Sequence, residues 1–245
     1  MSNQPVLKRA LVTGGSGDIG SAICARLASQ YHVIVHANSR LDRAEAVVSQ
    51  IVAAGGQASA VAFDVSDAQA TSASLEALLE QGPIQVLVNN AGIHDDAVFP
   101  GMSPDQWRRV IDVSLHGFFN VTQPLSMPMI RTRWGRIISV SSIAAVLGNR
   151  GQVNYAAAKA ALHGASKSLS LELASRGITV NVVAPGIIQG RMAEGSFDPA
   201  AIAQMVPMKR AGQPSEVAEL VGFLASDAAA YISGQVISIN GGMPS

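Results

Sequence analysis

The stretch RALVTGGSGDIGSAICARLAS, residues 9–29, places an apolar run, a glycine-rich turn and a helical pattern one after another. Gly15, Gly17 and Gly20 have the spacing G-x-G-x-x-G between a predicted strand and a predicted helix. Glycines at such a turn let the N-terminus of the helix approach a pyrophosphate closely. The stretch therefore predicts a strand–turn–helix unit that binds a dinucleotide, and the alternative is an ordinary glycine-rich turn.

Short apolar runs and longer helical patterns alternate through the rest of the 245 residues. This alternation is typical of repeated βαβ units whose strands are covered by helices on both faces. The sequence predicts an α/β fold, a Rossmann-like doubly wound parallel sheet of about seven strands. We expect residues 1–245 to form a single dinucleotide-binding domain, with ligands outside the carboxyl ends of the strands. The predicted strands after the first are HVIVH, SAVAF, QVLV, RIISV, TVNVVAP and QVISI.

The composition narrows the classes of partner and of compartment. Hydrophobic residues make up 48% of the chain, the formal net charge is zero, and no run of Lys or Arg occurs. Nucleic-acid and membrane-surface binders carry a basic footprint, so neither partner is expected. The only cysteine, Cys24, excludes an internal disulfide, and the histidines lack metal-ligand spacing, so no metal is expected. Because no signal peptide or bilayer span is evident, we expect a cytoplasmic protein.

Tyr155 and Lys159 form a candidate acid/base pair. They lie four residues apart in a helical pattern, so both side chains emerge from one helix face. A fixed ammonium favours the phenolate, which predicts a Tyr155 pKa lowered toward neutral pH. The alternative is a surface lysine beside a half-buried tyrosine.

The end of the second predicted strand indicates which dinucleotide is bound. An NAD-binding fold usually has Asp or Glu there, but this strand runs into Asn38, Ser39 and Arg40. Arg40 is able to pair with a 2′-phosphate, whereas Asp42 lies where the next helix begins. The sequence predicts NADPH, and the alternative for Arg40 is a solvated surface charge.

Four ordered motifs resemble the short-chain dehydrogenase/reductase family: TGGSGDIG, the NNAG of residues 89–92, the spacing of Ser142 with Tyr155 and Lys159, and the PG of residues 185–186. Three longer blocks, GNRGQVNYAAAKAAL, ELASRGITVNVVAPG and GQVISINGGM, are similar to 3-oxoacyl-[acyl-carrier-protein] reductases, including aryl-polyene-pathway relatives. The resemblance spans essentially the whole chain.

The resemblance implies a role for each matching residue. Tyr155 would be the general acid, Lys159 would hold the nicotinamide ribose and lower the tyrosine pKa, and Ser142 would hydrogen-bond the substrate carbonyl. Asp64 would hold the adenine amino group. The residues expected to bind the cofactor are Gly14, Ser16, Gly17, Ile19, Asn38, Ser39, Arg40, Asp64, Val65, Asn90, Ala91, Gly92, Tyr155, Lys159, Pro185, Gly186 and Ile188.

Three positions depart from the family pattern. Ser114, in IDVSLHGFF, stands where the family has a catalytic Asn that positions a water near the lysine. Either Ser114 holds that water as a fourth catalytic residue, or the relay is impaired. Asp18 replaces the second glycine of TGxxxGxG, and Gly190 replaces a threonine that bonds the nicotinamide carboxamide.

The resemblance also implies partners. Arg133 and Arg176 match arginines that dock acyl carrier protein, an acidic partner, beside the active-site mouth; the alternative is two solvated charges. Segments 93–102 and 189–205 are expected to close over the substrate. A homotetramer is implied as well.

The leading hypothesis is an NADPH-dependent reductase of 3-oxoacyl thioesters on acyl carrier protein, in fatty-acid or polyene-type biosynthesis. One alternative is a dehydrogenase of a small alcohol or ketone. Another, motivated by Ser114, Asp18 and Gly190, is a weakly catalytic partner subunit that binds NADPH.

Overall fold

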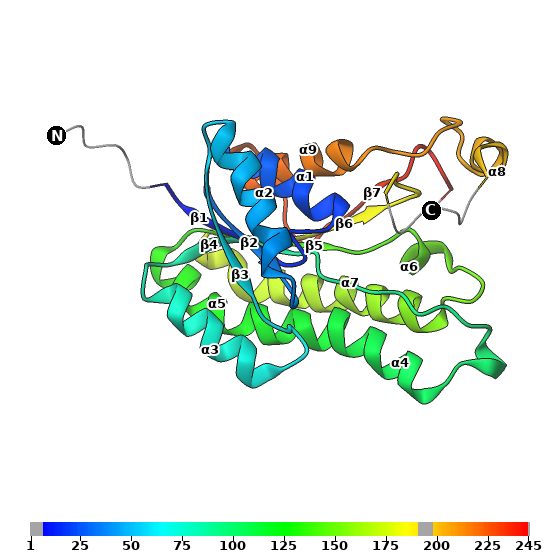
Figure 1. The fold of residues 1–245 in the computed structure, drawn as a ribbon, viewed down its shortest axis with the longest axis horizontal. Coiled ribbons are helices and arrows are strands. Elements are labelled where there is room, and N and C mark those ends of the chain that lie inside the picture. The colour runs from blue at the N-terminus through cyan, green and yellow to red at the C-terminus, as the bar shows by residue number, and fades with distance from the viewer. Residues whose placement is uncertain (1–6, 191–197, 245) are drawn as a thin grey trace.

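Parallel strands form one sheet in the computed structural model, which describes residues 7–190 and 198–244 (Figure 1). Within that part of the chain the sheet has seven strands in the order β3-β2-β1-β4-β5-β6-β7, which confirms the predicted α/β fold. The order turns back between β1 and β4, the kind of switch point at which doubly wound sheets bind nucleotides. The strands are β1 Arg9–Val12, β2 His32–Ala37, β3 Gln57–Ala62, β4 Ile84–Asn89, β5 Gly135–Val140, β6 Ile178–Pro185 and β7 Val236–Ile239.

Helices cover both faces of the sheet, with α1, α2 and α9 on one face and α3, α5 and α7 on the other (Figure 1). None of the helices in the described residues has the length and apolar character needed to cross a membrane. The α-helices are α1 Asp18–Leu27, α2 Leu41–Ala53, α3 Ala68–Leu79, α4 Pro104–Ile111, α5 Gly117–Thr132, α6 Ala144–Leu147, α7 Val153–Leu173, α8 Pro199–Met205 and α9 Pro214–Ala225. Short helical turns are η1 Phe99–Gly101, η2 Asp112–His116, η3 Ala174–Arg176 and η4 Asp227–Ala229.

Alternate residues of each strand fill a separate core on each face. In β1, Ala10 and Val12 pack with Cys24 of α1, whereas Leu11 packs with Leu125 of α5. All five side chains are completely buried. Full burial of one Val or Leu side chain stabilises the fold by about 1.5–3 kcal/mol. A register slip in β1 would exchange the two sets, so this packing fixes where the following turn begins.

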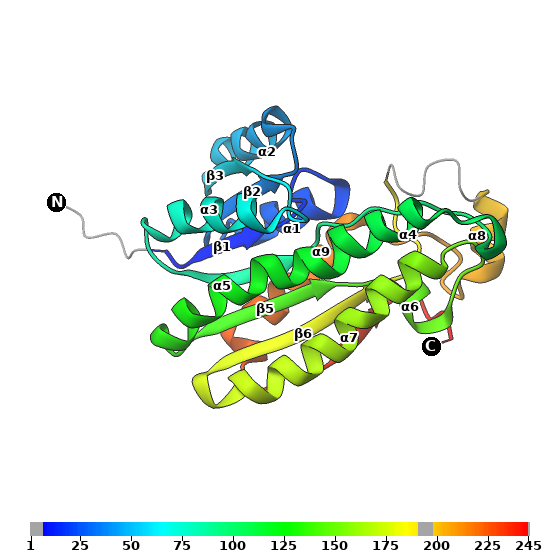
Figure 2. The ribbon, with the colours of Figure 1, turned by 90° about the horizontal axis from the view of Figure 1, so that it is seen from below.

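The carboxyl ends of the strands bring most predicted site residues to one edge of the sheet. The glycine turn follows β1, residues 90–92 follow β4, Ser142 follows β5 and Gly186 follows β6. Lys159 reaches the same edge from α7, because its Nζ donates to the carbonyl of Val140. Figure 2 shows α6 and α8 beyond the ends of β5 and β6.

Candidate active site

The glycine turn forms a close-packed cradle at the N-terminus of α1. Gly14 has φ +62°, and a Cβ there would lie 3.0 Å from the Cα of Ala91. A Cβ at Gly20 would collide with the carbonyl oxygen of Gly14. Gly17 caps α1, and its N–H donates to Gly14 O over 3.1 Å. The turn thus leaves the helix N-terminus open to a ligand backbone, and these residues fit the pyrophosphate of a dinucleotide.

Asn90 fastens the end of β4 to this cradle. Its Nδ2 donates to the carbonyls of Thr13 and Gly14, over 2.9 and 3.1 Å. The Thr13 hydroxyl oxygen accepts from the backbone N–H groups of Asn90 and Ala91, each over 3.0 Å. The side chain of Asn90, which the resemblance assigns to cofactor binding, therefore has a structural role in holding the turn.

His36 holds the backbone of the glycine turn through a hydrogen bond with Gly14. It is 1% exposed, and its Nδ1 accepts from the N–H of Gly14 over 3.0 Å. The proton must then reside on Nε2, which donates to the carbonyl of Phe63 over 2.8 Å. Burial lowers the pKa of His36 to about 4, so the ring is neutral at pH 7.

The groups expected to recognise the adenosine end are exposed at the ends of β2 and β3. Asn38, Ser39 and Arg40 follow β2, and the Arg40 guanidinium makes a two-point ion pair with Asp42, at 2.8 and 2.6 Å. This pair lowers the pKa of Asp42. Asp64 follows β3, and its Oδ1 accepts from the N–H and hydroxyl of Ser66. A cofactor 2′-phosphate at Arg40 has to compete with Asp42.

Lys159 is buried at the centre of the site. It is 3% exposed, its Nζ donates to Val140 O over 2.9 Å, and burial lowers its pKa to about 8. The same Nζ lies 5.9 Å from the centre of the Tyr155 ring. Both side chains therefore emerge from one face of α7, as predicted.

The pKa of Tyr155 is raised, so the predicted lowering is wrong for this structure. Burial is the main cause, the Asp96 carboxylate raises the pKa further, and a hydrogen bond with Ser142 opposes both. Lys159 does not reverse the shift because its ammonium is directed to Val140 rather than to the phenol oxygen. Tyr155 is thus a protonated acid in contact with Ser142.

Ser114 faces the same space as Lys159 from the π-helical turn η2. A Cβ at Gly92 would lie 2.9 Å from Lys159 Nζ and 3.7 Å from Ser114 Oγ. Ser114 is 3% exposed, and its Oγ has no hydrogen-bond partner among the described residues. A cavity with room for about one water molecule adjoins Ser114, with Thr13 and Asn89 also on its wall. Because the cavity wall is partly polar, the site fits a water held by Ser114.

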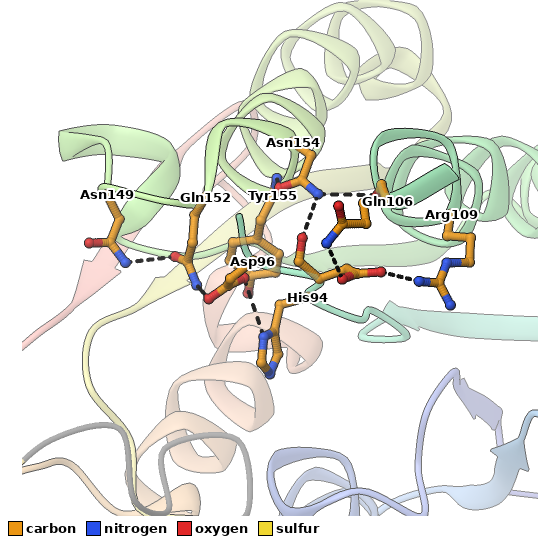
Figure 3. Close-up of polar contacts among 9 residues, drawn as sticks. His94, Asp96, Gln106, Arg109, Asn149, Gln152, Asn154 and Tyr155 are labelled. Carbon is orange, nitrogen blue, oxygen red and sulfur yellow. Dashed lines mark hydrogen bonds and ion pairs between the residues drawn. The ribbon is translucent and has the colours of Figure 1, made fainter. Parts of the chain in front are cut away.

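Asn154 anchors the backbone of Tyr155 and went unassigned in the sequence. It is completely buried, and its Oδ1 accepts from the N–H of Tyr155 over 2.8 Å. Its Nδ2 donates to the carbonyls of Asp95 and Gln106, over 3.0 and 3.1 Å (Figure 3). The sequence feature that could have indicated this role is an amide side chain directly before the predicted catalytic tyrosine.

Two carboxylates fasten the loop after Gly92 to the helices beside it. Asp95 accepts from Gln106 Nε2 over 2.9 Å and forms an ion pair with Arg109, both on α4. Asp96 accepts from Gln152 Nε2 over 2.8 Å and lies 3.3 Å from Nδ1 of His94 (Figure 3). This part of the segment 93–102 is therefore held beside Tyr155.

The segment after β6 forms the facing wall of the site. The Pro185 carbonyl accepts from the N–H of Ile143, and Gly186 N–H donates to Ile239 of β7. Ile188 forms a parallel bridge with Gly212. Of the segment 189–205 expected to cover the substrate, residues 191–197 lie outside the described residues.

Arg133 and Arg176 lie at the opposite edge of the sheet. Arg133 ends α5 and donates to the Ser175 carbonyl over 3.2 Å, and Arg176 follows α7. The 21 residues of α7, which runs along β6 in Figure 2, span about 30 Å. Tyr155 lies in the first turn of α7, and Arg176 lies in η3, beyond the other end of the helix. Within one chain, the expected placement of these arginines beside the active-site mouth does not occur.

The chain is similar in sequence to proteins of known function. The profile of the short chain dehydrogenase family matches residues 8–200. The 3-oxoacyl-[acyl-carrier-protein] reductase FabG of Aggregatibacter actinomycetemcomitans is 44% identical over 236 residues, covering 95% of this chain and 98% of that relative. The FabG of Staphylococcus aureus strain Mu50 is 45% identical over 240 residues, covering 96% and 98%. The 3-oxoacyl-[acyl-carrier-protein] reductase of a Synechocystis species is 45% identical over 237 residues, covering 96% of each chain.

Proposed function

Since the chain belongs to the short-chain dehydrogenase family, we propose that it reduces 3-oxoacyl thioesters on acyl carrier protein to 3-hydroxyacyl thioesters, with NADPH. The observation that carries the proposal is the meeting of Ser142, Tyr155 and Lys159, with Lys159 beside Gly92, at the ends of the strands where the glycine cradle also lies. The names and near-complete coverage of the relatives support the substrate class.

The proposed chemistry follows from the protonation states of the site. When bound, the cofactor supplies a hydride to the carbonyl carbon. The hydroxyl of Ser142 orients the carbonyl oxygen, and the phenol of Tyr155 donates its proton as negative charge develops there. A raised Tyr155 pKa keeps this proton in place until that moment. The Lys159 ammonium is charged below its pKa of about 8, and it would stabilise the phenolate that remains by turning from Val140 O toward the phenol oxygen.

We propose that Ser114 takes part in returning a proton to Tyr155 after each reaction. Its unpartnered, buried Oγ faces the space beside Lys159 and adjoins a cavity of about one water. A water in this cavity would be held by Ser114, and a second water between Ser114 Oγ and Lys159 Nζ would link it to Lys159 in place of a longer amide side chain.

The NADPH preference rests on Arg40. No carboxylate directly follows β2, and the guanidinium offers the fork that binds a phosphate. The ion pair of Arg40 with Asp42 lies at the surface, so it contributes little to stability. A phosphate that takes the place of Asp42 would therefore lose little by breaking this pair.

Docking of the carrier protein is proposed to occur across two copies of the chain in a homotetramer. Arg133 and Arg176 lie about 30 Å from Tyr155 of the same chain, as the length of α7 requires. An antiparallel pairing of α7 with α7 of a second copy places the arginines of one chain beside the tyrosine of the other. Leu171, 84% exposed on α7, and Met127, 50% exposed on α5, provide apolar surface for that pairing.

The test is NADPH oxidation by the purified protein with a 3-oxoacyl carrier protein, compared with NADH and with a free β-keto ester. We expect turnover with NADPH and the carrier substrate. A preference for a free alcohol or ketone would indicate the small-molecule dehydrogenase instead, and NADPH binding without turnover would indicate the weakly catalytic subunit.

A further inference from the structure

His163 continues the stripe of α7 on which Tyr155 and Lys159 lie. The three residues are spaced four apart, so their side chains emerge along one face of the helix. The His163 Nε2 lies 2.8 Å from Oγ of Ser141. Because Ser141 follows β5 and directly precedes Ser142, the imidazole reaches the strand end that carries the hydroxyl proposed to orient the substrate.

Ser141 ties α7 to the two strands beside it. It is 4% exposed, its N–H donates to Val183 O of β6 over 2.7 Å, and its Oγ lies 3.0 Å from the carbonyl oxygen of Lys159. A carbonyl only accepts and a hydroxyl has one hydrogen, so the Ser141 hydroxyl donates to Lys159 O.

The direction of that bond fixes the protonation of the imidazole. Since the Ser141 hydrogen is given to Lys159, His163 must donate to Ser141 Oγ from Nε2. Burial and the charge of Lys167 lower the pKa of His163, so the ring is neutral at pH 7 and this Nε2–H is its single donor. The chain of bonds therefore runs from the imidazole through the hydroxyl to the backbone of Lys159.

This chain of bonds holds the main chain of Lys159, whereas the lysine side chain has to change its partner in the proposed reaction. In this structure Lys159 Nζ donates to Val140 O, which also links α7 to the end of β5. That link is lost when the ammonium turns toward the phenol oxygen of Tyr155. The bond from Ser141 to the Lys159 carbonyl does not depend on where the ammonium points, so it persists through the turn.

We propose that His163 is a positioning residue: by donating to Ser141 it directs the hydroxyl hydrogen to the Lys159 carbonyl, and it so holds this turn of α7 against β5 while the ammonium moves. The inference rests on the proposed function. Without the imidazole N–H, the Ser141 hydroxyl is free to rotate, and Ser142 and Lys159 lose part of their alignment.

The first test is steady-state kinetics with NADPH and a 3-oxoacyl carrier protein. His163→Leu has a comparable size and no donor, and it should lower kcat about tenfold with KM for the carrier substrate changed by less than about twofold. His163→Gln, whose amide N–H₂ replaces the ring donor, should recover most of the loss. His32→Leu is the matched control, because it removes an imidazole that contacts Ser59 Oγ over 3.0 Å at the opposite edge of the sheet, and it should leave kcat unchanged.

Two further measurements show whether His163 acts through Ser141. The double variant His163→Leu/Ser141→Ala should have the same kcat as Ser141→Ala alone, because the imidazole has no separate route to the site. In protein with ¹⁵N-labelled histidine and no cofactor, the Nε2–H signal of His163 should be observed by NMR at pH 7.5. It should disappear in Ser141→Ala, because an unbonded ring N–H exchanges rapidly with water.

Full kcat in His163→Leu, in protein whose thermal unfolding shows that it is folded, would overturn the inference. A further loss of kcat in the double variant would do the same, as would a ring that carries its hydrogen on Nδ1. These results leave the proposed function intact if the unchanged protein turns over. If the unchanged protein did not reduce the carrier substrate, the proposed function would be wrong, and this inference would fall with it.

Discussion

Burial of Lys159 has a direct consequence for the pH dependence of the proposed reaction. Its ammonium is lost as pH rises through about 8, whereas the raised pKa of Tyr155 keeps the phenol protonated there. We therefore expect kcat/KM for reduction to fall above pH 8. Initial rates between pH 6 and 10 measure this limb. Lys159→Arg keeps a charge at all these pH values, so its residual activity should lack the limb; a limb that persists in this variant would contradict the assignment.

His36 makes the folded state sensitive to acid. Its pKa is about 4 in the folded protein and about 6.5 when unfolded, so the unfolded state binds more protons between these values. Stability is thus lost as pH falls from about 7 toward 4, by about 2 kcal/mol at pH 5. Urea unfolding at pH 7.5 and 5 should show a smaller loss for His36→Gln, by about that amount. Equal losses would show that His36 is not the responsible group.

Substitution of Ser114 should affect catalysis much more than the stability of the fold. Its hydroxyl has no partner among the described residues, so Ser114→Ala should change the free energy of unfolding by less than about 1 kcal/mol. If the hydroxyl holds the relay water, turnover of the same variant should fall about tenfold. Steady-state kinetics and urea unfolding of one preparation check both. Full turnover in Ser114→Ala would exclude Ser114 from the relay.

At the scale of elements, Asn154 joins the start of α7 to the loop after Gly92 and to α4. Asn154→Ala would leave buried backbone groups without partners, at a cost of about 3 kcal/mol, and would release Tyr155 from its position. We expect kcat to fall more than KM rises. Gln152→Ala is the matched control. It removes a hydrogen bond to Asp96 from the residue directly before α7, and it should keep most of kcat. Wild-type kcat in Asn154→Ala would contradict a positioning role.

The sequence was a good guide to elements and a poorer one to contacts between them. Period and composition predicted the alternating strands and helices, because each buried strand is a short apolar run between turn residues. The spacing of Tyr155 and Lys159 likewise predicted their shared helix face. Local spacing carries no information on burial, so it missed the raised pKa of Tyr155 and the role of Asn154. The approach of Asp18 to Gly190 could not be predicted, because the two residues are far apart in the sequence and meet only in the folded chain.

At the scale of the whole molecule, carrier docking across two chains is testable by mixing variants. Tyr155→Phe lacks the acid, and the double variant Arg133→Glu/Arg176→Glu lacks the docking site. Each should reduce carrier-bound substrate poorly, but co-refolded mixtures should regain activity, because the arginines of the first serve the tyrosine of the second. The arginine variant alone should still reduce a free β-keto ester. Mixtures no more active than their components would place docking within one chain or elsewhere.

Transfer of a hydride from NADPH to the substrate is the defining step of the proposed reaction, and isotope labelling detects it. The protein is incubated with [4,4-²H₂]NADPH and a 3-oxoacyl carrier protein, and the acyl product is analysed by mass spectrometry. We expect a 3-hydroxyacyl product with one deuterium at C3, formed at least about a hundredfold more slowly by Tyr155→Phe. An unreduced substrate despite bound NADPH, or equal rates for both proteins, would contradict it.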